Sequence, residues 1–275
     1  MRQFGRVLAA IAAVAFGCAA YLYLTLPDVR PLRTQAPATT AFMQLRAREA
    51  AAHGERARRA EHWVPYARIS PNLKRAVLVA EDSRFWQHGG IDFEQVRESM
   101  EVNWERGEFA RGASTITQQL AKNLYLSPSK NPVRKIRELL ITRRLEAELS
   151  KQRIFELYLN VIEWGDGVWG ADAAAHRYFH TSAAALDPAQ SALLAAAIIN
   201  PRLLDPAHPG ARLRRREQMI LRRMGAAAPP PVVIESAAPA PVPPLPEPAV
   251  LPAPSGAPAT LPGAPLPVTR KPDGG

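Results

Sequence analysis

The longest run of hydrophobic positions in the chain is Val7–Leu26, which holds 20 residues and no charged side chain. A run of this length matches the hydrocarbon thickness of a bilayer and predicts a membrane-spanning helix. Arg2 and Arg6 precede the run, which favours a short cytoplasmic segment at residues 1–6. A cleaved signal peptide is the alternative, since Cys18 is a small residue of the kind that precedes a cleavage site. Both interpretations export the rest of the chain.

A second hydrophobic pattern, with the period of a helix, begins at Ser70-Pro71. Serine is a favoured N-cap and proline a favoured first-turn residue, so this pair predicts the start of a helix. The apolar residues that follow have the i, i+3, i+4, i+7 spacing of a buried helix face. They are Leu73, Ala76, Val77 and Ala80.

Glu81 comes directly after this apolar face, near the expected C-terminal end of the helix. Burial and the helix dipole both disfavour negative charge there, so we expect a raised pKa and a stronger base. Phe85 and His88 continue the same face if the helix persists, and Gly89-Gly90 can end it. A structural ion pair between Glu81 and a nearby arginine is an equally open alternative.

A cluster of hydroxyl and amide side chains follows at a second predicted helix start. Gly112 permits close approach of a ligand to the backbone, and Ser114 and Thr115 offer hydroxyls beside unpaired helix amides, which attract anions. Further polar groups lie on the next turns; they are Thr117, Gln118, Gln119, Lys122 and Asn123. The pattern suits a phosphate or a sugar, although an ordinary capped helix would produce part of it.

Asn131-Pro132 predicts a third helix, with asparagine as the cap and proline in the first turn. Arg134 and Glu138 are four residues apart and share a face, with Lys135 beside them. Two cations and a carboxylate thus project together, either as a binding group or as a surface ion pair. Val133, Ile136 and Leu140 form an apolar stripe on the same helix.

Period-2 alternation, the mark of strands, is scarce, so the fold class predicted is mainly α. The glycines near residues 165–170 indicate a tight loop between helices. We expect a linker at residues 27–38, a folded domain at residues 39–224 and a tail at residues 225–275. That tail holds 16 of the 27 prolines and has almost no aromatic residue, so we expect it to be disordered.

The charge balance is basic, with 35 Lys and Arg against 25 Asp and Glu. Such an excess favours acidic partners such as nucleic acid, anionic lipid or a phosphorylated substrate. The chain has one cysteine, Cys18, which excludes an intramolecular disulfide.

The polar clusters together resemble the motifs of the peptidoglycan glycosyltransferases. EDSRFWQHGG, at residues 81–90, resembles the first motif, Glu-Asp-x-x-Phe-x-x-His-x-Gly. GASTITQQ, at residues 112–119, is similar to the second motif, with Ala113 in place of its second glycine. RKIRE, at residues 134–138, resembles the third motif, and KQRIFELYLNVIEWG and GADAAAHRYF resemble the fourth and fifth. The likeness covers roughly residues 39–205.

Two further stretches, TTAFM and GDGVWGADAAA, resemble the monofunctional branch, the biosynthetic peptidoglycan transglycosylases. The bifunctional relatives, the penicillin-binding proteins, carry a transpeptidase domain after the glycosyltransferase. Ser127 and Lys130 match the Ser-x-x-Lys of transpeptidases, but no Lys-Thr-Gly follows, so we interpret that match as chance.

The resemblance implies a lysozyme-like helical domain that polymerises lipid II into β-1,4-linked glycan strands, with inversion and release of undecaprenyl diphosphate. Glu81 matches the catalytic base, and Glu138 matches the second catalytic acidic residue, which orients cations or a metal. The positions that match substrate-binding residues are Asp82, Phe85, His88, Gly112, Ser114, Thr115, Gln118, Gln119, Lys122, Asn123, Arg134 and Lys135.

The same resemblance implies the partners and the location. We expect lipid II and the growing glycan strand as ligands, a single-pass anchor in the bacterial inner membrane, and a catalytic domain on its periplasmic face. The tail would recruit cell-wall synthesis or division proteins, and nucleic acid is not expected as a partner. No cofactor is required, although a divalent cation, Mg²⁺ or Mn²⁺, is compatible with a diphosphate site.

Two alternatives belong to other functional classes. A lytic glycosidase of lysozyme-like fold also needs paired carboxylates, but it does not need the cations Arg134 and Lys135. A scaffold that recruits partners through the tail is compatible with the prolines, but it leaves Glu81 unexplained.

Overall fold

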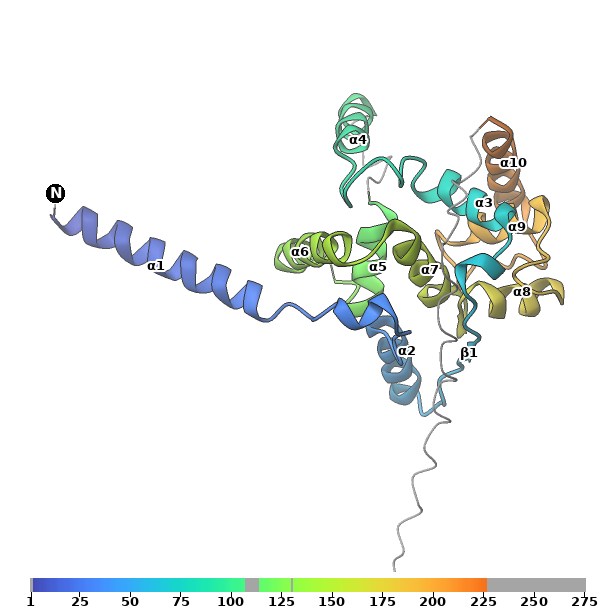
Figure 1. The fold of residues 1–275 in the computed structure, drawn as a ribbon, viewed down its shortest axis with the longest axis horizontal. Coiled ribbons are helices and arrows are strands. Elements are labelled where there is room, and N and C mark those ends of the chain that lie inside the picture. Colours follow the sequence, from blue (N-terminus) through green and yellow to red (C-terminus); the bar gives the residue numbers. More distant parts are fainter. Residues whose placement is uncertain (1, 107–113, 130, 227–275) are drawn as a thin grey trace, which may run out of the picture. The chain divides into compact units, whose positions relative to one another are not determined.

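The computed structural model describes residues 2–106, 114–129 and 131–226 of the chain, and Figure 1 shows its helices. Mostly helical structure confirms the predicted fold class. The α-helices are α1 (Arg2–Leu24), α2 (Ala41–Ala52), α3 (Pro71–Glu81), α4 (Phe93–Arg106), α5 (Ile116–Tyr125), α6 (Pro132–Glu148), α7 (Lys151–Val161), α8 (Ala171–Phe179), α9 (Pro188–Ala197) and α10 (Ala211–Ala226). The 3₁₀ helices are η1 (Arg30–Arg33) and η2 (Tyr66–Arg68).

A small sheet accompanies the helices. It is formed by β1 (Ala60–Glu61), β2 (Glu163–Gly165) and β3 (Val168–Trp169), in the order β1-β3-β2. β1 runs parallel to β3, and β2 pairs with β3 in antiparallel orientation. The predicted glycine-rich loop at residues 165–170 is therefore the turn region of a short hairpin.

The predicted helix starts are confirmed by their caps. The Ser70 hydroxyl accepts from the Asn72 amide, and the Asn131 side chain accepts from the Val133 amide. Thr115 and Gln118 form a reciprocal capping box at the start of α5. Each cap satisfies an amide that has no partner inside its helix.

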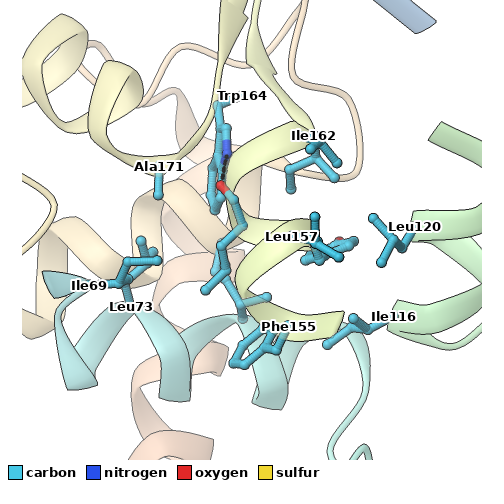
Figure 2. Packing of buried hydrophobic residues seen from close by; sticks show 14 of the residues in the cluster. Ile69, Leu73, Ile116, Leu120, Phe155, Leu157, Ile162, Trp164 and Ala171 are labelled. Atoms are coloured by element: carbon cyan, nitrogen blue, oxygen red, sulfur yellow. Dashed lines mark hydrogen bonds between the residues drawn. The ribbon is translucent and has the colours of Figure 1, made fainter. Parts of the chain in front are cut away.

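α5 lies between α6 and α7, and α3 packs against α9 and α10 (Figure 1). α7 packs between the group of α5 and α6 and the group of α3, α9 and α10, and most of its side chains are buried. In Figure 2, side chains of α7 lie between Leu120 of α5 and Leu73 of α3. The Phe155 ring lies 5.5 Å from that of Phe85, which fixes the loop that follows α3.

The structure differs from the sequence prediction at the end of α3. The helix stops at Glu81, because Asp82 adopts an extended backbone with φ −162° and ψ 79°. The predicted continuation of the helix through Phe85 and His88 is therefore wrong, and these residues lie in a loop. Gly112 and most of the predicted tail lie outside the described residues.

The N-terminal segment is also more structured than a simple linker. α1 is exposed along its length, whereas Val29 and Leu32, within the predicted linker, are buried in the core. Arg144 of α6 donates to the Tyr23 and Leu26 carbonyl oxygens, each at 3.3 Å. The residues after α1 are thus attached to the domain.

Candidate active site

Glu81 ends α3, and its carboxylate is surrounded by groups from two other helices. Gln119 Nε2, from α5, donates to Glu81 Oε2 at 2.9 Å. Burial raises the pKa of Glu81, the Gln119 hydrogen bond and the charges of Arg216 and Lys122 lower it, and the negative charge of Asp82 raises it further. The net effect is a raised pKa, as the sequence predicts, so Glu81 is placed to act as a base.

Asp82 connects the loop after α3 to the start of α5. Its side chain is 1% exposed, and its Oδ2 accepts from the Ile116 amide at 3.0 Å. The carboxylate also contacts His88 Nε2 at 2.9 Å. Because the Gly90 amide donates to His88 Nδ1 at 3.1 Å, the imidazole carries its proton on Nε2 and donates it to Asp82.

The start of α5 is satisfied by the protein itself. Thr115 Oγ1 donates to the Gly90 carbonyl oxygen at 2.7 Å and accepts from the Gln118 amide at 3.2 Å. The Ile116 amide donates to Asp82. In this arrangement the amides of Ile116 and Gln118 are therefore not available to an external anion. Ser114 is exposed, and Gly112 lies outside the described residues.

Lys122 links Glu81 to the first turns of α6. Burial lowers the pKa of the Lys122 ammonium, and the negative charges of Glu138 and Glu81 oppose that effect. The charges of both carboxylates thus act on Lys122. Asn123 is 8% exposed and donates from Nδ2 to the Gln119 backbone oxygen at 2.8 Å, so it supports α5 at this point.

Glu138 holds the predicted pair of cations in place. Its carboxylate is 3% exposed, and its two oxygens accept from Arg134 Nη1 and Lys135 Nζ. The Lys135 side chain is 43% exposed, so its ammonium also faces solvent. The structure thus brings Arg134, Lys135 and Glu138 together, as the spacing predicts.

The positive charge around Glu138 bears on the expected divalent cation. Each oxygen of Glu138 already accepts from a cation, and the charges of Arg134 and Lys135 repel a second cation. As arranged, this group fits an anion such as a diphosphate better than a metal ion.

A second group of possible ligand atoms lies in the loop after α3. Asp82, His88 and Asp92 offer atoms that lie within 4.8 Å of one another. Each of them has protein partners, and Asp92 accepts from Arg84 Nε and from the Gln95 amide, both at 2.9 Å. We interpret this group as an internal network that shapes the loop.

A pocket of about 660 Å³ opens beside the same loop, between Arg84 and His88 on one side and Arg143 and Glu146 of α6 on the other. Glu81 is absent from its lining. This pocket is therefore distinct from the surroundings of the basic carboxylate of Glu81.

Two residues near Glu81 were missed by the sequence prediction. Arg216 comes from α10, where its Nε donates to the Ala196 carbonyl oxygen at 3.2 Å, and its charge acts on Glu81. Tyr158 comes from α7, and its hydroxyl contacts Gln119 Oε1 at 2.9 Å. Neither has a local pattern that marks it, since both positions lie within helices of apolar or basic residues.

Phe85 has a different role from the predicted contact with substrate. It is 0% exposed and packs edge-on against Trp86, with ring centroids 5.1 Å apart. The Lys151 ammonium lies over the Phe85 ring, 4.3 Å from its centroid. Phe85 therefore anchors the loop, and its assignment to substrate binding stays a prediction.

The assembled site combines a desolvated carboxylate with three cations across α5 and α6. A base of this kind accepts a proton from a hydroxyl group, and fixed cations stabilise negative charge on a leaving group. Together these groups suit the transfer of a sugar from a phosphate to a hydroxyl.

Comparison with known proteins supports that chemistry. The family profile described as Transglycosylase matches residues 48–225. The chain belongs to the transglycosylase family. It is 52% identical over 169 residues to the biosynthetic peptidoglycan transglycosylase of Dechloromonas aromatica, covering 62% of this chain and 73% of that protein. The protein of the same name from Laribacter hongkongensis is 51% identical over 169 residues, covering 62% and 74%.

Membership of the transglycosylase family establishes the class of the protein. It is a glycosyltransferase with peptidoglycan transglycosylase activity in cell-wall biosynthesis, and its helical domain is lysozyme-like. Within the described residues, Gln3–Leu24 of α1 is long and apolar enough to cross a membrane. This helix is consistent with a membrane-associated cell-wall enzyme.

Proposed function

We propose that the protein polymerises lipid II into β-1,4-linked glycan strands by an inverting mechanism, without a transpeptidase activity. The observation that supports this proposal is the arrangement of two groups about α5. Glu81 accepts a hydrogen bond from Gln119 of α5, and Glu138 accepts from Arg134 and Lys135 on α6, which packs against α5. A base and cations held on packed helices can act on one substrate.

In the proposed reaction, Glu81 accepts the proton of the 4-hydroxyl group of the acceptor GlcNAc. The acceptor oxygen then forms a bond to C1 of the donor MurNAc, on the face opposite the diphosphate. The bond between C1 and the phosphate oxygen breaks, and undecaprenyl diphosphate leaves with the electron pair.

The cations act on the leaving group in this mechanism. Negative charge grows on the diphosphate as the bond to C1 breaks, and Lys122, Arg134 and Lys135 offset it. Glu138 orients Arg134 and Lys135 through the two ion pairs that it makes. No step in this sequence requires a metal ion.

The proposed location follows from α1. We assign it as a single-pass anchor in the inner membrane, with residues 39–224 on the periplasmic face, where lipid II is polymerised. Arg2 and Arg6, before the apolar run, favour a cytoplasmic N-terminus, and Arg30 and Arg33 after the run act against that bias.

The cations also separate this proposal from a lytic glycosidase. Purified protein and the Lys135→Ala variant are incubated with labelled lipid II and, in parallel, with diphosphate-free peptidoglycan. We expect the parent to form polymer and the variant to be about ten- to a hundred-fold slower, since a charge-assisted hydrogen bond is lost. Neither protein should release sugars from finished peptidoglycan.

A matched control is Arg177→Ala, which removes an exposed cation on α8. It should polymerise lipid II at the rate of the parent. If parent and Lys135→Ala instead cleave mature glycan equally well, the protein is lytic and the assignment of the cations is wrong.

A further inference from the structure

Glu81 is the end of a chain of two hydrogen bonds that begins at a buried phenol. The Tyr158 hydroxyl lies 2.9 Å from Gln119 Oε1, and Gln119 Nε2 lies 2.9 Å from Glu81 Oε2. These residues are 39 and 38 positions apart along the sequence and come from α7, α5 and α3. The contact therefore depends on how the three helices pack.

The direction of the two bonds follows from the chemistry of the groups. Tyr158 is 0% exposed, and burial together with the charges of Glu81 and Asp82 raises the pKa of its phenol well above the usual value. The phenol therefore keeps its proton and donates it to the amide oxygen of Gln119. The amide nitrogen of Gln119 must then face Glu81, where it donates to the carboxylate.

We propose that Tyr158 is a positioning residue for the reaction: it holds the Gln119 side-chain amide in the orientation that fixes Glu81 Oε2 and leaves Oε1 for the acceptor hydroxyl. The proposal rests on Glu81 being the base of the proposed function. It assigns Gln119 to the support of Glu81 instead of direct binding of substrate.

The backbone of Gln119 is held by hydrogen bonds at its amide and at its carbonyl oxygen, which makes the backbone rigid here. Its backbone amide donates to the Thr115 carbonyl oxygen at 3.0 Å, and its backbone oxygen accepts from Asn123 at 2.8 Å. Its side-chain amide can still adopt two orientations, which exchange the positions of the oxygen and the nitrogen. The Tyr158 hydroxyl, which donates, and the Glu81 carboxylate, which accepts, favour the same orientation. The other orientation would place the amide nitrogen of Gln119 against the donated proton and its oxygen against Glu81.

The orientation of Gln119 also sets the charge state of Glu81. The charged groups that face Glu81 are Asp82 beside it, Lys122 from α5 and Arg216 from α10. The Gln119 hydrogen bond lowers the pKa of Glu81 against the effect of burial. Loss of the Tyr158 hydroxyl would weaken that bond, so the pKa would rise and less of the base would be ionised at neutral pH.

The test compares Tyr158→Phe, Gln119→Met and the double variant in the full-length protein with labelled lipid II. We expect kcat to fall about ten- to a hundred-fold in Gln119→Met, which loses a hydrogen bond to a charged group. In Tyr158→Phe, which loses a bond between neutral groups, kcat should fall about two- to tenfold, and KM should stay nearly unchanged in both. The acid limb of the kcat profile should move to higher pH in all three. The double variant should be no slower than Gln119→Met, because Tyr158 acts through Gln119.

Tyr178→Phe is the matched control. It removes the hydroxyl of a half-buried tyrosine outside the site, which donates to the Trp164 carbonyl oxygen at 3.3 Å. It should keep the kcat and the pH profile of the parent. Additive losses in the double variant, or an unmoved acid limb in Tyr158→Phe, would overturn the proposal.

A measurement without substrate separates this proposal from the proposed function. The infrared carboxyl signal of Glu81, isolated by subtracting the spectrum of Glu81→Gln, is titrated in the parent and in Tyr158→Phe. The titration should move to higher pH in Tyr158→Phe and stay in place in Tyr178→Phe. Such a shift supports the positioning role even if the parent does not polymerise lipid II, and identical titrations refute it. Gln119→Met removes the hydrogen bond that Tyr158 is proposed to orient, so its titration should move at least as far. An unmoved titration in Gln119→Met would also refute the proposal, even if Tyr158→Phe does not fold.

Discussion

Glu81 shows at the scale of one residue why a functional carboxylate differs from a structural one. The apolar face of α3 predicts its burial, and the structure confirms the raised pKa. The sequence could not predict its partners, because Gln119 lies 38 residues away and Arg216 belongs to the last described helix. Among the described residues, the hydrogen-bond partner of Glu81 is the amide of Gln119, and arginine acts on Glu81 through the charge of Arg216.

The raised pKa of Glu81 predicts a pH-dependent gain in stability for Glu81→Gln. An acid whose folded pKa is raised binds its proton more tightly in the native state, so native stability falls as pH rises through that range. The neutral amide avoids this loss. Thermal unfolding should give a higher Tm for the variant than for the parent at neutral pH, and the difference should disappear in acid. A Tm below that of the parent at every pH would contradict the account.

Gly90 is the position in the loop after α3 where a side chain is least tolerated. Its φ is +89°, and a Cβ there would lie 2.7 Å from Thr142 Cγ2 and 2.8 Å from Glu146 Cγ. Gly90→Ala should cost at least about 2 kcal/mol of unfolding free energy, which lowers Tm by about 4–8 °C. Gly89→Ala is the control, because a Cβ at Gly89 meets nothing within 4 Å. Equal Tm values for the two variants would contradict this reading.

Among the helices, the first residue was easier to predict than the last residue or the side that packs against the core. Ser70-Pro71 and Asn131-Pro132 mark the starts of α3 and α6 by local chemistry alone. The end of α3 depends on Asp82 reaching across to α5, which no local pattern contains. The sheet was missed because its strands have two or three residues, too few for alternation.

In α6, a charged side chain is buried and apolar side chains are partly exposed, which is the reverse of the usual helix pattern. The predicted apolar stripe is partly exposed, with Val133 at 50% and Ile136 at 48%, whereas the carboxylate of Glu138 is buried. Hydrophobicity alone would predict that Val133 and Ile136 pack against the core. The ion pairs of Glu138 with Arg134 and Lys135 account for the polar face, because they satisfy the buried charge.

The cap that Asp82 provides for α5 can be tested by two substitutions. Asp82→Ala removes the acceptor for the Ile116 amide and for His88, so the unfolding free energy should fall by about 1–3 kcal/mol. Asp82→Asn keeps an oxygen that accepts from one of them and should lose less. Urea unfolding of both variants measures the difference. Equal stability of Asp82→Ala and the parent would show that Asp82 is not a cap.

At the scale of the whole molecule, the anchor and the domain are joined by residues that belong to the core. Leu26, at the end of the predicted membrane span, and Val29 and Leu32, in the predicted linker, are all buried. Arg33 also pairs with Glu148 at the end of α6, at 2.5 Å. The membrane span at residues 7–26 and the domain at residues 39–224 stay predictions, and the boundary between them depends on long-range packing.

Two truncations should therefore differ sharply in stability. Removing residues 2–24 deletes α1 alone and should leave the Tm of the domain close to that of the parent in the same detergent. Removing residues 2–33 also deletes the three buried side chains, each worth roughly 1.5–3 kcal/mol, and should lower the Tm strongly. Equal Tm values for the two truncated proteins would contradict the packing of this segment.

The initial rate of lipid II polymerisation by Glu81→Gln, relative to the parent, tests the central claim most directly. Loss of a general base costs about 100- to 10,000-fold, so the variant should be slower by at least the lower of these factors, while its helical content is retained and its Tm is not lowered. A folded variant that polymerises lipid II at a rate near that of the parent would remove Glu81 from the mechanism.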